Sequence, residues 1–396
     1  MSSTDAAEPL IPALRDYWSR RLRALRGESV APDRRRQHLD RMLSDSLGIG
    51  LEQIARFFAT VPSFEALQQF VLDCHGGAIA PARLAWANAL QDGSAYPRDI
   101  AERHARVRSL APVLDAQALA HWNEHGFVVL HDAITADECA AVRAAVHEFI
   151  GADPDDPHSW YAPGKRQGIM VQLFQHPALE AARGSLRIHK AFAQLWGTED
   201  LVMTADRCGF NPPENGGFRF PGPHLHWDAE LVPPLGPGIQ GILYLGDTAA
   251  DQGAFTCVPG FHRGIDDWLR VLPAGADPYE RMPAADARPI AGAAGDLILW
   301  HHALPHGSSP NRSRCPRVVQ YLTMYPARPA FADRPDVMRA AAEPRCSTPL
   351  GAGPRRTGRE IRRRPRQGGA WPRTAGHRST TSSRLPNGRS SNAPDR

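Results

Sequence analysis

Two neighbouring side chains, His226 and Asp228, have the types and the spacing of metal ligands. Residues two positions apart in an extended strand point to the same face, so this imidazole and this carboxylate would lie together. Nitrogen and oxygen ligands suit a borderline divalent metal, and a second histidine from a distant strand would complete a set of two histidines and one carboxylate. Such a set leaves three coordination positions open to small molecules, whereas a four-ligand structural zinc site leaves none.

The second imidazole is to be sought among His301, His302 and His306. We favour His306, because it precedes an expected tight polar turn at 307–308 and stands 11 residues before Arg317. Arg317 begins an apolar strand, and its guanidinium can bind the distal carboxylate of a dicarboxylic acid through two parallel hydrogen bonds. His302 has an arginine at a similar spacing, but that arginine falls in a polar loop and is the poorer anion site.

The elements that must hold these residues are short strands, separated by breaks rich in glycine and proline. Many short strands with turn signals predict an all-β sandwich or barrel instead of alternating strand and helix units. The glycine-rich loops that bind nucleotide phosphates are absent from the sequence. The strand candidates are 168–172, 201–205, 239–245, 254–258, 296–300 and 318–325.

The first 110 residues are predicted to be helical. Apolar residues recur at helical spacing over 51–58 and over 64–74, and Ser63 is the expected N-cap of the second run. We therefore predict a helical N-terminal region, a β domain and a tail. Their expected bounds are 1–113, 114–330 and 331–396.

The β domain is expected to open with two helices around a strand. A short helix at 117–124 leads into a compact apolar strand at 126–130. The helix that follows is marked by a capping box, in which Thr135 and Glu138 satisfy each other's backbone N–H groups.

The composition is that of a globular protein, with 42% hydrophobic and 22% charged residues in 396. The six cysteines contain no CxxC pair, so neither a disulfide framework nor a thiolate zinc site is expected. The acidic, polar start of the chain does not resemble a secretory signal, and no stretch approaches the roughly 18 apolar residues of a membrane span. We predict a cytoplasmic protein without a membrane partner.

The net charge of +4 combines two opposite parts. Residues 345–396 hold 13 Arg, no Lys, one Glu and one Asp, which is +11 and leaves −7 for residues 1–344. A segment with so few aliphatic residues cannot bury enough surface to offset chain entropy, so it is expected to be disordered. We interpret it as a solvated tail or the product of a shifted reading frame rather than an RNA-binding arm, and expect no nucleic-acid partner.

The stretch from about 115 to 326 resembles the phytanoyl-CoA dioxygenase family. The resemblance implies a mainly β core, which is a double-stranded β-helix (jelly roll) with flanking helices. It further implies that His226, Asp228 and His306 hold ferrous iron, that Arg317 anchors 2-oxoglutarate, and that O₂ is the other cosubstrate. The pieces that carry the resemblance are 126–130 with the helix after it, 226–228, 253–263, and 304–308 leading to Arg317.

Other residues match the family less closely. Gln172 lies on a strand that in the family often faces the cosubstrate or substrate, and Trp227 would border the same pocket. A packing role is the alternative for both. His224 would share the face of the ligands as an outer partner, whereas His262 and Arg263 are expected to be structural.

The retained carboxylate of Asp228 favours oxygenation, most simply hydroxylation, because halogenases of the family have a small residue in its place. The substrate is expected to be a small organic molecule, oxidised with release of succinate and CO₂. Two alternatives stay open. The first is a cupin-like metalloenzyme that does not use 2-oxoglutarate, and the presence of Arg317 at its spacing argues against it. The second is a catalytically silent binding protein on the same fold, and the intact set of metal ligands argues against it. The substrate and the oligomeric state do not follow from the sequence.

Overall fold

The computed structural model describes residues 10–28, 33–162 and 164–328. The tail predicted at 331–396 lies outside these residues, and the expected domain bounds near 113 and 330 stay predictions. Within the described part of the chain, we find no helix with the length and the apolar character that crossing a bilayer requires.

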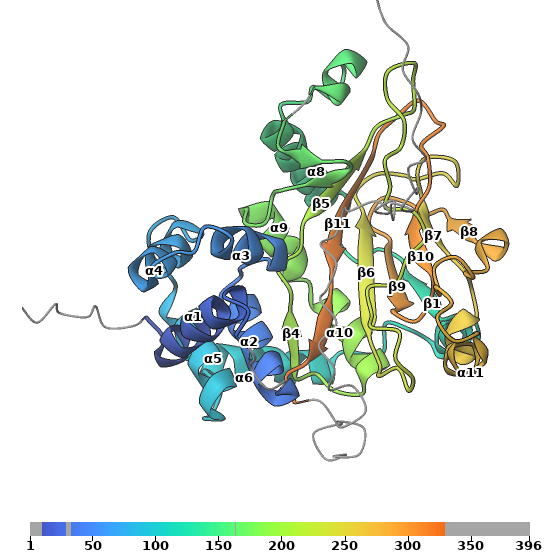
Figure 1. Ribbon diagram of the computed structural model, residues 1–396. Coiled ribbons are helices and arrows are strands. Elements are labelled where there is room, and N and C mark those ends of the chain that lie inside the picture. The colour runs from blue at the N-terminus through green and yellow to red at the C-terminus, as the bar shows by residue number, and fades with distance from the viewer. Residues whose placement is uncertain (1–9, 29–32, 163, 329–396) are drawn as a thin grey trace, which may run out of the picture. The chain divides into compact units, whose positions relative to one another are not determined.

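The N-terminal part of the described chain is helical, as the apolar spacing predicted. Its helices are α1 (Pro12–Leu25), α2 (Arg34–Ser46), α3 (Leu51–Phe58), α4 (Phe64–Asp73), α5 (Pro81–Asp92) and α6 (Arg98–Ser109). Ser63 caps α4, since its side chain accepts a hydrogen bond from the backbone N–H of Ala66. Leu14, Phe58 and Leu67 are buried in one apolar cluster formed by these helices. Figure 1 shows the helices gathered on one side of the sheets.

The β core consists of antiparallel strands in two sheets that share one apolar interior. The large sheet of the described chain runs β1 (Phe127–Leu130), β9 (Leu297–His301), β6 (Ile239–Tyr244), β11 (Arg317–Leu322), β5 (Cys208–Asn211), β3 (Met170–Val171) and β2 (Arg166–Gln167). The small sheet runs β10 (His306–Ser308), β7 (Phe255–Cys257) and β8 (Arg288–Ile290), while β12 (Met324–Pro326) pairs with β4 (Leu201–Met203).

The chain passes between the sheets repeatedly, with β6, β9 and β11 in the large one and β7, β8 and β10 in the small one. One apolar cluster joins side chains from both sheets, among them Tyr244 of β6, Phe255 of β7 and Trp300 of β9. This winding with a shared interior is a double-stranded β-helix, so the fold implied by the family resemblance is confirmed.

Strand β11 shows how the large sheet sorts its side chains. Val318 and Leu322 belong to the apolar cluster on the outer, helix-covered face. Val319 and Tyr321 belong to the cluster between the sheets. Because side chains alternate along a strand, Arg317 shares this inner face with Val319. An arginine at the start of β11 is thereby directed into the interior of the β-helix.

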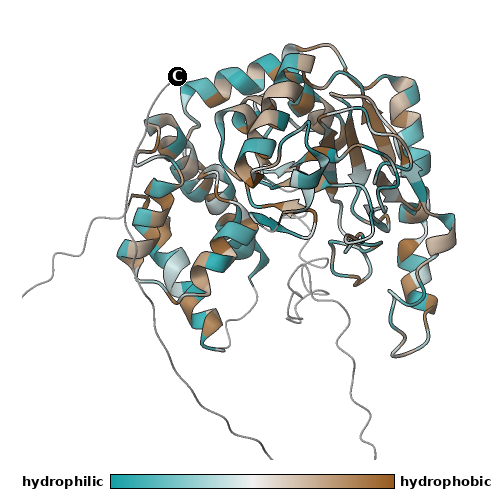
Figure 2. Ribbon diagram, turned by 90° about the horizontal axis from the view of Figure 1, so that it is seen from above, coloured by the Kyte–Doolittle hydropathy of each residue, from teal (hydrophilic) through white to brown (hydrophobic). Residues whose placement is uncertain are grey.

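Helices pack on the apolar cluster of the outer face of the large sheet. They are α7 (Ala116–His125), α8 (Ala136–Ile150), α9 (Pro177–Arg183) and α10 (Leu186–Trp196), with the 3₁₀ helix η1 (Pro157–Tyr161). Helix α11 (Ile265–Val271) packs in the cluster around Trp227, and the remaining 3₁₀ helices are η2 (Phe261–Arg263) and η3 (Ala284–Asp286). The predicted capping box of Thr135 and Glu138 starts α8. The helices carry apolar and polar stripes (Figure 2), as expected where one face packs on a sheet.

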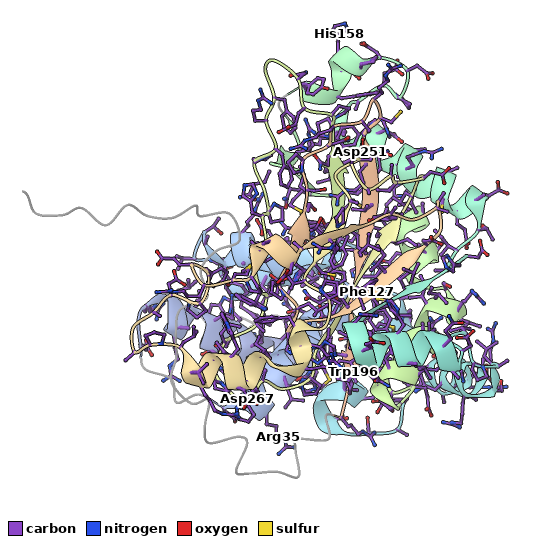
Figure 3. All side chains as sticks on the ribbon, turned by 90° about the vertical axis from the view of Figure 1, so that its right-hand side faces the viewer. Arg35, Phe127, His158, Trp196, Asp251 and Asp267 are labelled. Atoms are coloured by element: carbon purple, nitrogen blue, oxygen red, sulfur yellow. The ribbon has the colours of Figure 1, made fainter. Side chains whose placement is uncertain are left out.

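Some predicted elements differ from the structure. The tight turn expected at 307–308 is part of β10, because these residues pair in register with β7. The strand expected over 168–172 is one side of a hairpin of β2 and β3, in which Gly168 adopts a φ of +62°. Strand β5 was not predicted, since Gly209 and Asn211 dilute its apolar pattern. The side chains between and around the sheets are drawn in Figure 3, where Phe127 marks β1 and His158 marks η1.

Candidate metal centre

His226 and Asp228 lie in a loop, so the extended strand expected there is wrong. Only His226 is paired, in an isolated β-bridge in which its backbone and that of His306 exchange hydrogen bonds of 2.8 and 3.0 Å. Trp227 packs into a separate apolar cluster, and its indole N–H donates to the carbonyl oxygen of Ala303 at 2.9 Å. The two-residue alternation still holds locally, because the side chains on either side of Trp227 meet at one place.

The side chains of His226, Asp228 and His306 converge. One ligand atom from each lies within 4.8 Å of the other two. Nε2 of His226 is 3.4 Å from Oδ1 of Asp228, and Nε2 of His306 is 3.4 Å from Oδ2 of the same carboxylate. The His306 side chain is 4% exposed, while those of His226 and Asp228 are 21% and 33% exposed. Two imidazoles and a carboxylate that meet in this way fit a divalent metal.

Hydrogen bonds set the tautomer of both histidines. Nδ1 of His226 is 2.7 Å from the carbonyl oxygen of His224, and Nδ1 of His306 is 3.0 Å from that of Leu304. A carbonyl oxygen only accepts, so each Nδ1 carries the proton that it donates. In the neutral imidazoles Nε2 then carries the lone pair that a metal needs, whereas in the protonated imidazoles the same Nε2 atoms donate to the Asp228 carboxylate. The Nδ1 hydrogen bonds are the outer support that metal-binding histidines normally have.

The charges of the group stabilise one another. Burial disfavours the ionised form of Asp228, but hydrogen bonds from His226 and His306 and their positive charge outweigh it and hold the pKa of Asp228 well below its usual range. Burial likewise disfavours protonated His226, yet the hydrogen bond and charge of Asp228 raise its pKa above the usual value. The carboxylate therefore stays ionised, as a metal ligand must.

Arg317 is a completely buried arginine without a carboxylate partner among the described residues. Its Nη1 donates to Oγ of Ser308 at 3.0 Å, while Nε and Nη2 are buried and make no hydrogen bond there. Nε and Nη2 share the guanidinium edge that binds a carboxylate side-on. Ser308 stands two residues after His306 on β10, so the arginine is tied to the strand that carries one of the converging histidines. The site therefore fits an anionic ligand beside the metal.

Unpaired amides extend the polar interior. Asn211 lies opposite Arg317 in the pairing of β5 with β11, and its buried Oδ1 has no hydrogen-bond partner among the described residues. Gln172 follows β3, and both polar atoms of its side chain are likewise buried without such a partner. Gln172 stands two residues after Met170, which pairs with Gly209 of β5, and side chains two positions apart point to the same face. Gln172 is therefore directed to the inner face. A cosubstrate role for Gln172 stays a prediction.

The Trp227 side chain is used in packing. It is 4% exposed, and its ring lies 5.5 to 6.0 Å from those of Phe261, Trp268 and Tyr279. Its one polar atom donates to Ala303, which leaves no free hydrogen-bonding group for a ligand. These contacts describe a packing role for Trp227. Its expected role at the cosubstrate stays a prediction.

The rival histidines do not join the converging group. Nε2 of His302 lies 2.6 Å from the carbonyl oxygen of Gly236, and Nδ1 of His301 accepts from the backbone N–H of Ala303. Burial, with the charges of neighbouring histidines, lowers the pKa of His301 to about 3. The contact that His224 makes with the site in the described chain is its backbone carbonyl, which accepts from Nδ1 of His226.

Gln240 belongs to the site and was not predicted. Its Nε2 donates to Oδ2 of Asp228 at 2.7 Å, which is the shortest contact of that carboxylate within the described chain. The only trace in the sequence is one polar residue at an inner position of the apolar run 239–245. That trace does not reveal its partner, because the loop of Asp228 reaches β6 only in the folded chain.

The chain matches one protein family over half of its length. The sequence profile of the family described as phytanoyl-CoA dioxygenase (PhyH) matches residues 122–319. A Dictyostelium discoideum protein that carries the family's name is 20% identical over 257 residues, which cover 52% of this chain and 74% of that protein. A methylphosphonate hydroxylase of Gimesia maris is 23% identical over 216 residues, which cover 52% of this chain and 78% of that enzyme. The crystal structure of AviO1 from Streptomyces viridochromogenes is 20% identical, with a TM-score of 0.40, and the match covers 56% of this chain and 98% of that one.

Proposed function

Because this chain belongs to the phytanoyl-CoA dioxygenase family, a family of iron- and 2-oxoglutarate-dependent oxygenases, we propose that it hydroxylates an unactivated C–H bond of a small organic molecule. The observation that carries the proposal is the buried Arg317 guanidinium, whose Nε and Nη2 have no hydrogen-bond partner among the residues that the structure describes. It faces the same interior as the converging ligand atoms of His226, Asp228 and His306.

The three converging residues are the proposed iron ligands. They supply two imidazole nitrogens and one carboxylate oxygen and leave the other coordination positions open. Bound iron supplies the redox chemistry, by which O₂ and 2-oxoglutarate yield succinate, CO₂ and an oxygen atom for the substrate. The backbone carbonyls of His224 and Leu304 keep Nδ1 of the two histidines protonated, so that Nε2 remains available to the metal.

Arg317 is the proposed anchor of the far carboxylate of 2-oxoglutarate. Ser308 engages Nη1, and the opposite edge of the guanidinium is left to make two parallel hydrogen bonds. Complete burial excludes water from this contact and strengthens it electrostatically. A 2-oxoglutarate-independent metalloenzyme would have no use for a buried, unpaired cation at this place.

Asp228 supports hydroxylation over halogenation. Its carboxylate fills the ligand position that a halide would need, and its depressed pKa keeps it ionised. The substrate identity is the open part of the proposal, and a screen of small organic molecules for substrate-dependent succinate release addresses it directly.

The test of the proposed function is an anaerobic titration of the metal-free protein with Fe(II) and 2-oxoglutarate, followed by visible absorption. We expect a weak charge-transfer band in the wild type and its loss in Arg317→Met at the same 2-oxoglutarate concentration. Arg207→Met is the matched control, since Arg207 is also buried but already pairs with Glu52 at 3.1 Å. The control should keep the band.

A wild-type protein without the band would refute the use of 2-oxoglutarate. A band that survives unchanged in Arg317→Met would leave iron binding standing but refute the assigned anchor. Loss of the band in Arg207→Met as well would show that any loss of a buried arginine disturbs the site, and would remove the support from Arg317.

A further inference from the structure

Each of the two histidines is oriented by one hydrogen bond on its far side. His226 donates from Nδ1 to the His224 carbonyl, and His306 donates from Nδ1 to the Leu304 carbonyl. Asp228 has no Nδ1 to be held in this way, and it belongs to no helix or strand of the described chain. A carboxylate on a loop can rotate about its own bonds unless a neighbouring side chain holds it.

Gln240 supplies that contact. Its Nε2 donates to Oδ2 of Asp228 at 2.7 Å, whereas the two histidine Nε2 atoms are each 3.4 Å from the carboxylate. Gln240 lies on β6, which is hydrogen-bonded to β9 on one side and to β11 on the other. Its Cα partner on β9 is Trp300. A donor on an interior strand is a rigid reference point for a ligand on a loop.

We infer that Gln240 is a positioning residue, which engages Oδ2 of Asp228, fixes the rotation of the carboxylate and favours metal binding through Oδ1. The inference rests on the proposed function, because it concerns the same iron ligands. The contact on which the inference rests is the one between Gln240 and Asp228.

The consequence is a carboxylate that binds through one oxygen. A carboxylate with both oxygens free can take two coordination positions, and iron with six positions would then keep only two for other molecules. A chelating 2-oxoglutarate and O₂ together need three. A donated hydrogen bond on Oδ2 disfavours the two-oxygen mode and keeps the third position open.

A glutamine suits this task better than a cation would. Its amide N–H is neutral, so it fixes the carboxylate without cancelling the negative charge that attracts the metal. An arginine or lysine at the same position would form an ion pair that competes with metal binding. Oε1 of Gln240 is buried and has no partner among the described residues, so the amide has no competing acceptor role there.

The variant Gln240→Met tests the inference, because it keeps nearly the same length and removes the donor. We expect Fe(II) affinity, measured anaerobically by competition with a chromophoric chelator, to fall about 10- to 100-fold, as for other outer partners of metal ligands. At saturating iron, the charge-transfer band with 2-oxoglutarate should also weaken or shift. The melting temperature of the metal-free protein is measured in parallel. Gln240→Asn keeps the amide but is one methylene shorter, so it cannot reach Oδ2 of Asp228 to make the 2.7 Å hydrogen bond, and it should show the same losses.

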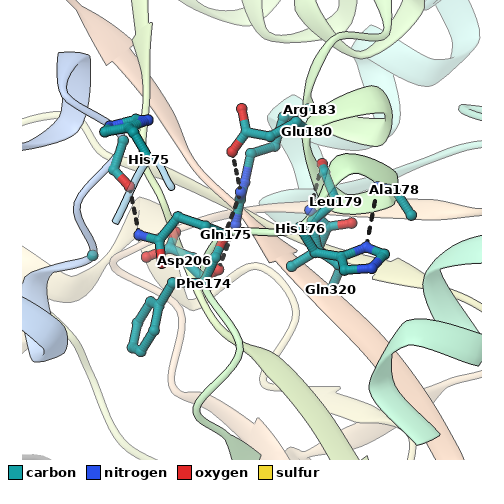
Figure 4. A network of polar contacts seen from close by, with 12 residues as sticks. His75, Phe174, Gln175, His176, Ala178, Leu179, Glu180, Arg183, Asp206 and Gln320 are labelled. Carbon is teal, nitrogen blue, oxygen red and sulfur yellow. Dashed lines mark hydrogen bonds and ion pairs between the residues drawn. The ribbon is translucent and has the colours of Figure 1, made fainter. Parts of the chain in front are cut away.

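Gln320→Met is the matched control. Gln320 is a buried glutamine on the neighbouring strand β11, and its Nε2 donates to the Leu179 carbonyl at 3.2 Å (Figure 4). Its Oε1 has no hydrogen-bond partner within the described ranges of the chain. It faces the outer side of the sheet, so its loss should leave the iron affinity and the band unchanged.

The outcomes separate the two proposals. If the wild type binds iron and shows the band, but Gln240→Met stays within twofold of it in affinity with an unaltered band, the positioning role is refuted while the proposed function stands. Equal losses in Gln240→Met and Gln320→Met would also refute it, since they would report general damage to the sheet. A wild type that neither binds iron nor shows the band overturns both proposals.

Discussion

Replacing Arg317 by methionine should stabilise the ligand-free protein while removing its response to 2-oxoglutarate. The guanidinium is completely buried, and two of its nitrogens lack a partner in the described chain. Each unpaired buried N–H costs about 1–3 kcal/mol, and the hydrogen bond to Ser308 offsets about 1.5–3 kcal/mol of this. The midpoints of these figures leave a gain of about 2 kcal/mol when the charge is removed.

The assay is thermal unfolding with Mn(II) as a redox-stable metal. At about 2 °C per kcal/mol for a chain of this size, Arg317→Met should melt roughly 4 °C above the wild type without cosubstrate. A 2-oxoglutarate concentration of 100 times Kd should stabilise the wild type by about 2.7 kcal/mol, or roughly 5 °C. The variant should show no such shift.

A variant that melts well below the wild type would refute the view of Arg317 as an uncompensated buried charge. A full 2-oxoglutarate shift in the variant would refute its role as the anchor. Succinate in place of 2-oxoglutarate serves as the control ligand, because it keeps the distal carboxylate but lacks the keto group.

Further outcomes follow from the same geometry. His306→Ala should abolish measurable Mn(II) binding by calorimetry, whereas His302→Ala should retain it, because Nε2 of His302 already contacts the Gly236 carbonyl; equal losses in both would contradict the ligand choice. In the metal-free protein, Asp228→Asn should lower the pKa of His226 in an NMR titration, since Asp228 is what raises it; an unchanged pKa would argue against the contact. Burial raises the pKa of Asp45 to about 7, so between about pH 4 and pH 7 the folded state holds a proton that the unfolded state has released. The bound proton stabilises the folded state, and this stabilisation is lost as the pH rises through about 7. Asp45→Asn should remove up to about 3 kcal/mol of that decline in urea denaturation between pH 5 and 8, and a parallel decline in both proteins would count against it.

Local pattern was sufficient for the helices with clear capping signals and for the longer apolar strands. The capping box of Thr135 and Glu138 and the cap of Ser63 were predictable, because each acts within one turn of helix. The hairpin around Gly168 was not, since its two strands are short and their pairing with β5 depends on a distant segment. The same limit hid β10, where Gly307 looks like a turn residue but pairs with β7.

Some residues of the site could likewise be predicted from the sequence, and one could not. His226, Asp228, His306 and Arg317 could be named from the sequence, because metal and carboxylate chemistry restricts the residue types and the family motifs restrict the positions. Gln240 could not, because a glutamine in an apolar strand has no chemical signature until a partner is known.

The chain's own residue order therefore accounts for the donor set, for the arginine that could hold an acid, and for short strands able to build a β-helix. The folded structure supplies what no local pattern contains. It pairs His306 with His226 in a β-bridge and places Gln240 beside Asp228. It also buries Arg317 with Nε and Nη2 lacking a hydrogen-bond partner in the described part of the chain. The energies of these arrangements depend on burial and on distances of a few ångströms, which arise only when the sheets close on each other.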